Sequence, residues 1–375
     1  METTGTFARP EYAQGLAEYL LKPKVLDDSA RRGVLLGGER GTGKSTFVQH
    51  DLLLALRALA AETVCIDLEL AGTKGPGGLV LQKLQALCKP EPSMAADLVR
   101  LRAETRGEPV KSKTAVQAPE GADMVESLRA IVDQRRTSVV LVLDNLQRAW
   151  GSGPGREFLQ TLKTAQQAIN GRPNPPGHFL VVGVGGPASV LREMAYGRSQ
   201  PLFGARYVQL ETLGEAYIQW VTSRWQGNPG IKLPSASALF KGFETLGHRP
   251  VSWQTALEIL QPMAGSPDQE FSTICATLAR ATAEADIQSI QKLGKLAQAV
   301  FDGVVRRETA NGIYADAARK RYGQSLGDGA EVSKSQVQKT IGRLLEAGWV
   351  TRDVNGEYVF ADRLLGEVWA RRQRV

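Results

Sequence analysis

The sequence predicts an α/β fold: a parallel sheet core, then a helical unit, then a winged helix at the C-terminus. Two observations support this prediction. Over the first two hundred residues, short apolar runs alternate with helical patterns, which is typical of a parallel sheet with helical crossovers. After Leu210 the strand signals stop and helical periodicity dominates. The chain therefore divides into a sheet domain and two smaller units.

Five apolar runs are expected to form the strands of the sheet, and helical patterns such as 45–59 and 124–133 lie between them. The five runs occupy residues 33–36, 63–68, 138–143, 179–184 and 207–210. The predicted sheet domain spans residues 1–212. An insert at about 89–121, rich in proline and charge, interrupts this domain, and its composition predicts a mobile segment.

Two predicted units follow the sheet: a helical domain over 213–289 and a winged-helix domain over 290–375. The helices of the first unit are expected at 215–225, 235–245, 251–260 and 271–288. In the second unit, helices at 293–306, 315–322 and 333–347 precede strands at 349–353 and 358–361. Asn355-Gly356 is the expected type I′ turn between those strands. Three helices followed by a hairpin make a winged helix.

Length and composition indicate a soluble protein with a sizeable core, because the 375 residues are 42% hydrophobic. No run approaches the roughly 18 apolar residues of a membrane span, and no basic segment with an apolar signal run opens the chain. A cytoplasmic protein without a membrane partner is therefore expected. The three cysteines lack the paired spacing of a zinc site, so we expect reduced packing residues at Cys65, Cys88 and Cys275.

A glycine-rich loop between the first strand and the next helix has the spacing of a phosphate-binding P-loop. It reads Gly38-Glu39-Arg40-Gly41-Thr42-Gly43-Lys44-Ser45. Its glycines allow successive backbone N–H groups to face a phosphate, and the following helix adds the positive end of its dipole. We expect Lys44 to bind the β- and γ-phosphates, Ser45 to ligate Mg²⁺ and Thr46 to reach the α-phosphate. The loop predicts bound Mg-ATP, and the alternative is a turn that binds nothing.

The apolar run 138–143 ends in Asp144 and Asn145. A carboxylate at the tip of a buried strand is well placed to hold the water shell of Mg²⁺, although an aspartate here also serves as a helix N-cap. A hydrolytic relative usually carries a glutamate at position 145. An amide orients water but is a very poor acceptor of its proton. The sequence therefore predicts slow hydrolysis, or nucleotide binding used as a clamp.

With the P-loop and Leu143-Asp144-Asn145-Leu146-Gln147 in view, the chain resembles the AAA+ superfamily of P-loop ATPases. It looks like the branch that holds STAND switches, archaeal ATPases, and origin-recognition and transposon-regulator ATPases. The acidic motif of that branch usually reads Asp-Glu followed two residues later by Gln, so Asp144 and Gln147 match and Asn145 departs at the catalytic position. The resemblance implies an AAA+-like core, a helical lid and then a winged helix.

The resemblance also implies roles for arginines outside the P-loop. Arg206 is the candidate finger that senses the γ-phosphate or a neighbour's site, with Arg192 and Arg198 as rivals. Arg249 lies in the turn that opens a lid helix and is expected to reach back to the bound phosphates. Arg9 lies in a short segment that is expected to pack beside the adenine. Each of these arginines has an alternative interpretation as an ordinary surface or turn residue.

The predicted helix 333–347 has an apolar face and a polar face. Its polar face offers residue types that bind phosphates and base edges when a recognition helix enters the major groove, and the wing adds an arginine. The candidate DNA-binding residues are Lys334, Ser335, Gln336, Lys339, Arg343 and Arg352. Residues 290–375 carry 15 Lys and Arg against 10 Asp and Glu, a surplus of five positive charges. This surplus favours an anionic partner such as double-stranded DNA.

Three functional hypotheses follow from the sequence. The first is a Mg-ATP-gated AAA+ switch that closes its core against the lid, assembles with other copies, and repositions the winged helix on DNA. The second is a STAND-like signalling or defence ATPase whose winged helix binds a protein effector. The third, prompted by Asn145, is a pseudo-ATPase that binds nucleotide without turnover.

Overall fold

The computed structural model describes residues 5–22, 28–88, 116, 121–150, 153–225, 232–260, 266–306, 312–327, 331–352 and 357–372. Most of the predicted insert at 89–121 and the predicted turn at Asn355-Gly356 lie outside these residues. Within them, no helix combines the length and the apolar character that a membrane span needs. The three cysteines are free thiols, as the sequence predicts.

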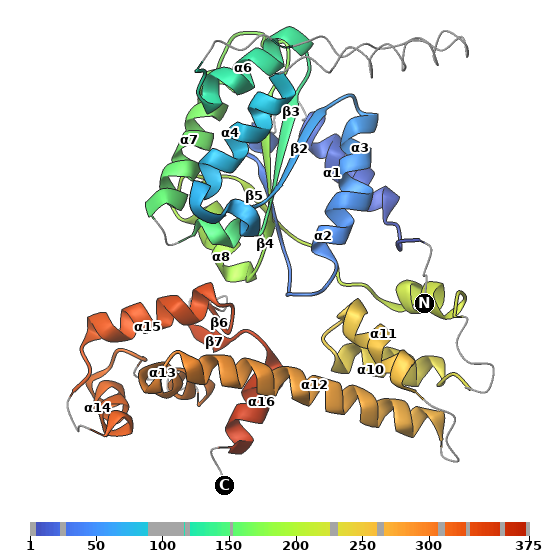
Figure 1. Cartoon of the computed structure of the whole chain (residues 1–375), viewed down its shortest axis with the longest axis vertical. Helices are drawn as coiled ribbons and strands as arrows, with labels where there is room; N and C mark the ends of the chain where they lie inside the picture. The colour runs from blue at the N-terminus through green and yellow to red at the C-terminus, as the bar shows by residue number, and fades with distance from the viewer. Residues whose placement is uncertain are drawn as a thin grey trace.

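A five-stranded parallel sheet forms the N-terminal unit, and its strand order is β2-β3-β4-β1-β5 (Figure 1). The prediction of five strands is confirmed to within about one residue at each end. The strands are β1 (Val34–Gly37), β2 (Glu62–Asp67), β3 (Val139–Asp144), β4 (Phe179–Gly185) and β5 (Arg206–Gln209). The three central strands β1, β3 and β4 are buried along their whole length. Fully apolar runs suit them because helices cover both faces of a parallel sheet.

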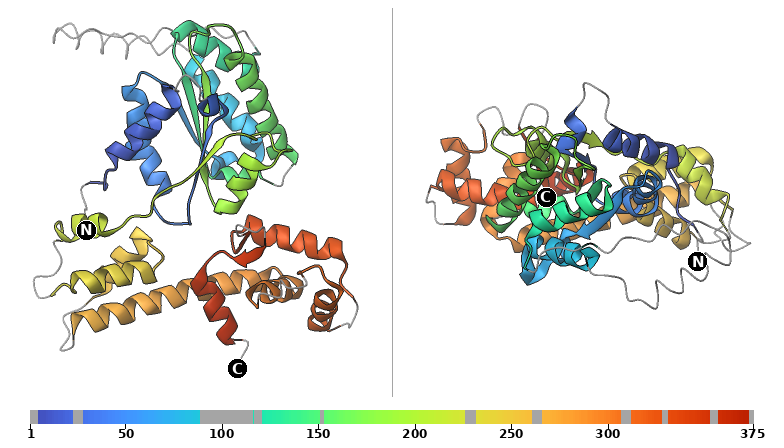
Figure 2. Two further views of the ribbon diagram at one scale, coloured as in Figure 1. Left: turned by 180° about the vertical axis from the view of Figure 1, so that it is seen from behind. Right: turned by 90° about the horizontal axis from the view of Figure 1, so that it is seen from above.

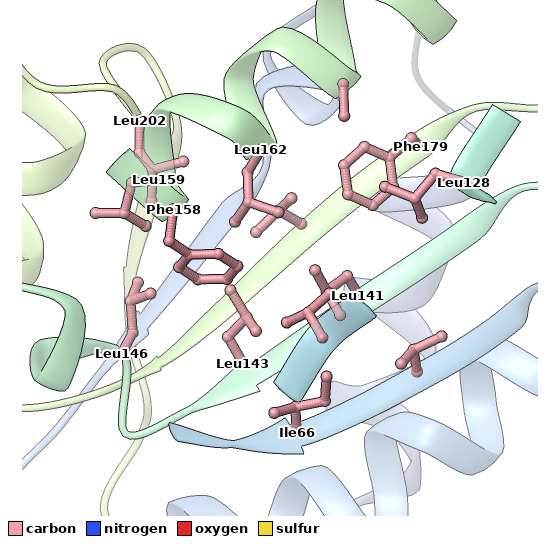
Figure 3. Packing of buried hydrophobic residues seen from close by; sticks show 14 of the residues in the cluster. Ile66, Leu128, Leu141, Leu143, Leu146, Phe158, Leu159, Leu162, Phe179 and Leu202 are labelled. Atoms are coloured by element: carbon pink, nitrogen blue, oxygen red, sulfur yellow. The ribbon is translucent and has the colours of Figure 1, made fainter. Parts of the chain in front are cut away.

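Two layers of helices enclose the sheet, each over its own apolar cluster. One layer holds α1 (Pro10–Leu21), α2 (Lys44–Phe47), the π-helix Val48–Leu52 and α3 (Leu53–Ala58). The other layer holds α4 (Gly75–Cys88), α6 (Met124–Arg135), α7 (Gly153–Asn170) and α8 (Ala188–Tyr196). Figure 3 shows the second cluster, where Phe158 and Leu162 of α7 face Leu141 and Leu143 of β3. This packing fixes the strand tips that carry the polar residues described below.

Among the described residues, four helices make the unit that the sequence predicts as a lid, called the lid unit below, and an aromatic cluster lies at its centre. They are α9 (Glu215–Thr222), α10 (Ala236–Thr245), α11 (Pro250–Ile259) and α12 (Pro267–Lys292). The first part of α12 buries Phe271 and Cys275 in the lid, and its last part buries Ile287 and Ile290 in the C-terminal unit. The predicted boundary at 289/290 therefore falls inside one continuous helix, which joins the two units.

The C-terminal unit has three helices, an antiparallel hairpin and a closing helix, the element order of a winged helix. These elements are α13 (Lys295–Val305), α14 (Asp316–Leu326), α15 (Lys334–Glu346), β6 (Val350–Arg352), β7 (Tyr358–Phe360) and α16 (Arg363–Arg372). Figures 1 and 2 show that the lid and the C-terminal unit form a layer along α12, with the sheet unit standing over it.

The hairpin of the C-terminal unit contacts the sheet unit directly. Thr351 of β6 donates a hydrogen bond from Oγ1 to Oγ of Ser189 at the start of α8, at 2.6 Å. A Cβ added to Gly348 would lie 4.0 Å from Cδ of Pro187, in the loop that follows β4. The hairpin is thereby held against the strand edge at which the P-loop also opens.

Candidate nucleotide site

The P-loop connects the end of β1 at Gly37 to the start of α2 at Lys44. Gly41 and Gly43 adopt φ values of +81° and +87°, which only glycine tolerates without strain. Gly186, after β4, approaches the loop so closely that an added Cβ would lie 2.7 Å from the carbonyl oxygen of Gly38. The loop thus has the backbone geometry that the sequence predicts for a phosphate cradle.

The ammonium of Lys44 lies inside the loop. Its Nζ donates hydrogen bonds to the carbonyl oxygens of Gly38, at 3.0 Å, and Glu39. Burial lowers the pKa of Lys44 to about 8, and the carboxylates of Asp144 and Glu39 oppose part of this shift. Since Asp144 acts on this ammonium, the tip of β3 and the P-loop belong to one site.

The low pKa of Lys44 makes nucleotide binding depend on pH. Lys44 binds phosphate as the ammonium, which is lost as the pH rises through about 8 in the free protein. We expect the Kd for Mg-ATP to rise between pH 8 and pH 9.5 by up to about tenfold per pH unit. Titrations with a fluorescent ATP analogue measure this change. Lys44→Arg, whose guanidinium stays charged, is expected to flatten the profile, and an equally steep profile in that variant would assign the titration to another group.

The donor set fits a magnesium ion bound with the nucleotide phosphates. The side chains of Ser45 and Thr46 are exposed at the start of α2, and Asp144 is 7% exposed at the tip of β3. A hydroxyl and a carboxylate are hard oxygen donors, and Mg²⁺ usually takes one or two of these together with phosphate oxygens and water. Ser45 and Asp144 would hold the ion, which would neutralise charge on the phosphates. Within the loop, Glu39 and Arg40 are exposed, while Thr42 is buried with its hydroxyl on the carbonyl of Glu39 at 2.9 Å.

Asn145 stands at the tip of β3 with a left-handed backbone, φ 55°. Its Nδ2 donates to Oδ1 of Asp67 at 2.8 Å, and its Oδ1 accepts a hydrogen bond from Nε2 of Gln147 at 3.2 Å. Asp67 ends β2 and is the register partner of Asp144. The sequence argument missed Asp67, although a carboxylate one residue before the end of the predicted strand 63–68 was a usable signal. The strand tips thus carry two carboxylates and an amide.

Arg249 comes from the lid and reaches the P-loop. A Cβ added to Gly41 would lie 3.5 Å from Cγ of Arg249, so the side chain of Arg249 lies beside the loop at Gly41. The guanidinium donates from Nη2 to Oδ2 of Asp362 at 2.7 Å. Arg249 therefore lies between the phosphate loop and the residue that precedes α16. The sequence predicts that Arg249 reaches back to bound phosphates, and it does not predict the pair with Asp362.

Arg9 and Arg206 lie at opposite ends of the sheet. The guanidinium of Arg9 stacks 4.7 Å from the ring centroid of Phe47 in α2, and its Nη1 donates to the carbonyl of Glu211 at 3.1 Å. Arg206 starts β5 opposite Val34, whereas the P-loop follows the far end of β1. Strand register therefore keeps Arg206 away from the P-loop of its own chain.

Arg192 and Arg198, the alternative candidates for the finger, lie near Arg206 rather than near the P-loop. Arg206 is exposed and stacks on Tyr19, with 4.5 Å between the guanidinium carbon and the ring centroid. Arg192 of α8 stacks in the same way on Tyr207 of β5, at 4.9 Å. Arg198 is exposed in the turn after α8. A role for Arg206 at a neighbour's site stays a prediction.

Helix α15 presents the polar face that the sequence predicts. Its candidate DNA-binding residues Lys334, Ser335, Gln336, Lys339 and Arg343 are all exposed. Gln336 also has a structural task, since its Oε1 accepts hydrogen bonds from the N–H and hydroxyl of the N-cap Ser333, both at 2.9 Å. Of Arg352 the structure describes the backbone, at the end of β6.

Comparisons with known proteins agree with this architecture. Residues 17–182 match the model of the AAA ATPase domain family. Among solved structures, a Walker-type ATPase of Pyrococcus abyssi matches with a TM-score of 0.56 and 14% identity, covering 97% of this chain and 96% of that one. The ORC2 protein of Aeropyrum pernix in its ADPNP–ADP complexes matches with a TM-score of 0.54 and 14% identity, covering 100% and 98%. The comparison with curated protein sequences found no match.

At these identities the two solved structures show a shared fold. That fold extends over nearly the whole chain, including the lid and the C-terminal unit. The sequence-based resemblance to AAA+ P-loop ATPases is therefore confirmed, as is the predicted parallel sheet core.

Proposed function

We propose that this protein, whose residues 17–182 match the AAA ATPase domain family, is a Mg-ATP-dependent switch that controls its own C-terminal unit. One observation supports this proposal above the others: Arg249 lies beside Gly41 of the P-loop and pairs with Asp362, the residue before α16. One side chain thus joins the phosphate cradle to the C-terminal unit.

The chemistry of Arg249 makes this link sensitive to nucleotide. The side chain of Arg249 is 23% exposed and that of Asp362 is 30% exposed, so the pair is partly shielded from water. The Nε–H group of Arg249 is buried and donates to no acceptor in the part of the chain that the structure describes. A nucleotide phosphate is a strong competitor for a guanidinium, because it offers more charge and more acceptor atoms than one carboxylate. Bound ATP would therefore draw Arg249 away from Asp362.

Loss of the Arg249–Asp362 pair would loosen the C-terminal unit from the sheet unit. The remaining links between them include the hydrogen bond from Thr351 to Ser189 and the approach of Gly348 to Pro187. A ligand shifts a conformational equilibrium only through different affinities for the two states. ATP has different affinities for the two states here, since Arg249 is available to its phosphates only in the open state, in which the pair with Asp362 is broken. Binding, rather than turnover, therefore operates the switch.

Asn145 also supports a switch that is operated by ATP binding rather than by hydrolysis. Its amide is committed to Asp67 and Gln147, and neither nitrogen nor oxygen of a primary amide removes a proton from water at neutral pH. Lys44, Ser45 and Asp144 still supply what Mg-ATP binding needs. We therefore infer that hydrolysis is slow and serves to reset the switch.

The partner that we propose for the released unit is double-stranded DNA. The exposed face of α15 carries Lys334, Lys339 and Arg343, and residues 290–375 carry a surplus of five positive charges. Cationic and amide side chains on a helix of a winged-helix arrangement suit phosphate and base-edge contacts. Binding through such contacts falls with salt, at a slope set by the number of phosphates neutralised.

Asp362→Asn tests the coupling. In the wild type we expect tight binding to duplex DNA only with Mg-ATP or a non-hydrolysable analogue. The variant loses the charged partner of Arg249, and we expect it to bind DNA without nucleotide at least about tenfold more tightly than the wild type does. Fluorescence anisotropy with labelled duplex at several salt concentrations measures both effects.

Glu346→Gln is the matched control, because it makes the same change in charge at an exposed position of α15 and leaves Arg249 untouched. Its DNA binding is expected to keep the wild-type dependence on Mg-ATP. Wild-type binding that ignores both nucleotide and salt would rule out the DNA role. A protein effector would then be the better partner for the C-terminal unit.

We further infer that Arg206 serves the site of a second copy. It is exposed at the end of the sheet opposite the P-loop, where it cannot serve its own chain. An arginine supplied by a neighbour is an established way to stabilise charge on the γ-phosphate. The proposal requires an oligomer that forms with Mg-ATP, and sizing chromatography with and without Mg-ATP checks this.

A further inference from the structure

The turn that carries Arg249 has a backbone conformation that side chains rarely adopt. His248, the residue before Arg249, has a φ of +53°, and Gly247 has a φ of +66°. Glycine tolerates this left-handed region, whereas most residues with a Cβ do not, although asparagine, aspartate and histidine are enriched there. The two left-handed residues turn the chain from α10 into α11 and place Arg249 at the N-cap of α11. The backbone of His248 therefore fixes the direction in which Arg249 leaves the turn.

The imidazole of His248 has a partner outside the turn. Its Nδ1 lies 3.2 Å from the carbonyl oxygen of Leu213, in the linker of residues 210–214 that joins β5 to α9. A carbonyl oxygen only accepts hydrogen bonds, so Nδ1 carries the proton and donates it. The ring also makes a T-shaped contact with Phe243 of α10, with 5.1 Å between the ring centroids. The side chain of His248 thus ties the turn both to the linker and to the aromatic cluster of the lid unit.

This hydrogen bond joins two residues that lie beside the P-loop. A Cβ added to Gly43 would lie 3.9 Å from Cδ1 of Leu213, and a Cβ added to Gly41 would lie 3.5 Å from Cγ of Arg249. Leu213 and Arg249 therefore lie beside two glycines of the loop that are two residues apart. Because His248 precedes Arg249 and is bonded to Leu213, it sets the spacing between these two neighbours of the phosphate cradle.

Few side chains suit position 248. Among the residues that are enriched in the left-handed region, asparagine and histidine carry an N–H donor on an atom bonded to Cγ, and aspartate does not. Nδ2 of asparagine and Nδ1 of histidine are both bonded to Cγ, so the two residues offer the donor at nearly the same place. Histidine alone of the three adds the ring that packs on Phe243. The donor and the ring of His248 can therefore be tested separately.

We propose that His248 is the positioning residue for Arg249: it holds the lid turn on the linker and thereby keeps the guanidinium beside the phosphate cradle. The inference rests on the proposed Mg-ATP switch and deepens it, because it names the residue that presents Arg249 to the nucleotide. Without the hydrogen bond to Leu213 the turn is free to relax, and Arg249 is then no longer preorganised for the phosphates. ATP affinity falls in that case although the side chain of Arg249 is intact.

The test is a double-mutant cycle of His248→Gly and Arg249→Ala in the full-length chain, with the Kd for a fluorescent ATP analogue as the readout. Glycine tolerates the left-handed backbone and removes the donor and the ring. A hydrogen bond of ordinary strength changes an equilibrium by about two- to tenfold, so we expect His248→Gly to raise the Kd by about three- to tenfold. In the Arg249→Ala background the same substitution should change the Kd by less than about twofold, because His248 acts through Arg249.

His248→Asn separates positioning from packing. It keeps the donor and suits the left-handed backbone, but it loses the ring beside Phe243. We therefore expect its thermal unfolding midpoint to fall as in His248→Gly, while its Kd stays within about twofold of the wild-type value. Arg136→Gly is the matched control, because Arg136 is exposed at the end of α6 with a φ of +49°, and this variant should leave the Kd unchanged.

The tautomer of His248 provides a readout on the wild-type protein. ¹⁵N NMR of the histidine-labelled chain without nucleotide reports which ring nitrogen carries the proton in the neutral imidazole. The chain has three histidines, and the signal that disappears in His248→Asn identifies His248. We expect the proton on Nδ1, because the carbonyl of Leu213 needs a donor there.

A proton on Nε2, an equal rise in Kd for His248→Asn and His248→Gly, or an undiminished effect of His248→Gly in the Arg249→Ala background would overturn the inference. Failure of the proposed function looks different. A wild-type chain that does not bind Mg-ATP, or one whose Kd is unchanged by Arg249→Ala, would overturn the proposed function together with the inference. If Arg249→Ala weakens Mg-ATP binding and His248→Gly does not, the inference alone is overturned.

Discussion

Lys44→Ala is expected to weaken Mg-ATP binding by about a hundredfold or more. Lys44 is the half-buried cation of the P-loop, and its Nζ donates to the carbonyl oxygens of Gly38 and Glu39, in the place of the phosphate oxygens that it would bind. Loss of one partner from a shielded charge pair costs about 2–5 kcal/mol, and about 1.4 kcal/mol changes an affinity tenfold. The Kd for a fluorescent ATP analogue measures the loss directly. The same variant should lose the effect of ATP on DNA binding.

Arg40→Ala is the matched control for Lys44→Ala. Arg40 is a cation of the same loop, but its side chain is exposed and its charge is screened by water. We expect its Kd to stay within about threefold of the wild type, because an exposed charge contributes only about 0–1 kcal/mol. If Lys44→Ala binds Mg-ATP as tightly as Arg40→Ala does, the P-loop is not the phosphate site.

The sheet and the P-loop are predictable from sequence because their signals are local. A buried parallel strand is a short, nearly continuous apolar run, as residues 139–143 and Phe179–Gly185 are, and this pattern is visible in the local sequence. The glycines and the lysine of the P-loop lie within eight consecutive residues. Five strands and one phosphate loop therefore follow from pattern alone.

Helix boundaries are less predictable, because hydrophobic periodicity does not distinguish an α-helix from a π-helical turn or show where a helix ends. The single helix predicted over 45–59 is interrupted by a π-helix at Val48–Leu52, which begins directly after the P-loop helix. The long helix α12 contributes to two separate apolar clusters, so its helical periodicity shows no break at the predicted domain boundary. Both features depend on the packing partners of the helix, which are far away in sequence.

The decisive contacts of the site depend on pairing between distant segments. Asp67 and Asn145 are 78 residues apart, and Arg249 and Asp362 are 113 apart. Strand order brings the first pair together, and the docking of the C-terminal unit brings the second pair together. The sequence identifies Arg249 and Asn145 as residues of interest, but it does not show that each is held by a carboxylate.

Trp253→Ala is expected to lower the stability of the lid unit by about 3–5 kcal/mol. Trp253 lies on α11, is fully buried, and packs edge-to-face on Phe243 and Phe271, with centroid distances of 5.7 and 6.4 Å. Its indole Nε1 donates to the carbonyl of Leu239 at 3.0 Å, so the truncation leaves a cavity and an unpaired acceptor. Urea and thermal unfolding followed by circular dichroism measure the loss.

Val251→Ala on the same helix is the control, because Val251 is 75% exposed and its truncation should cost less than about 0.5 kcal/mol. The functional consequence of Trp253→Ala follows from chain geometry: Arg249 immediately precedes α11, so a loosened helix cannot hold Arg249 between Gly41 and Asp362. We therefore expect Trp253→Ala, like Asp362→Asn, to bind DNA without ATP. If it unfolds more easily yet keeps the wild-type dependence on ATP, Arg249 is not the link between the nucleotide site and the C-terminal unit.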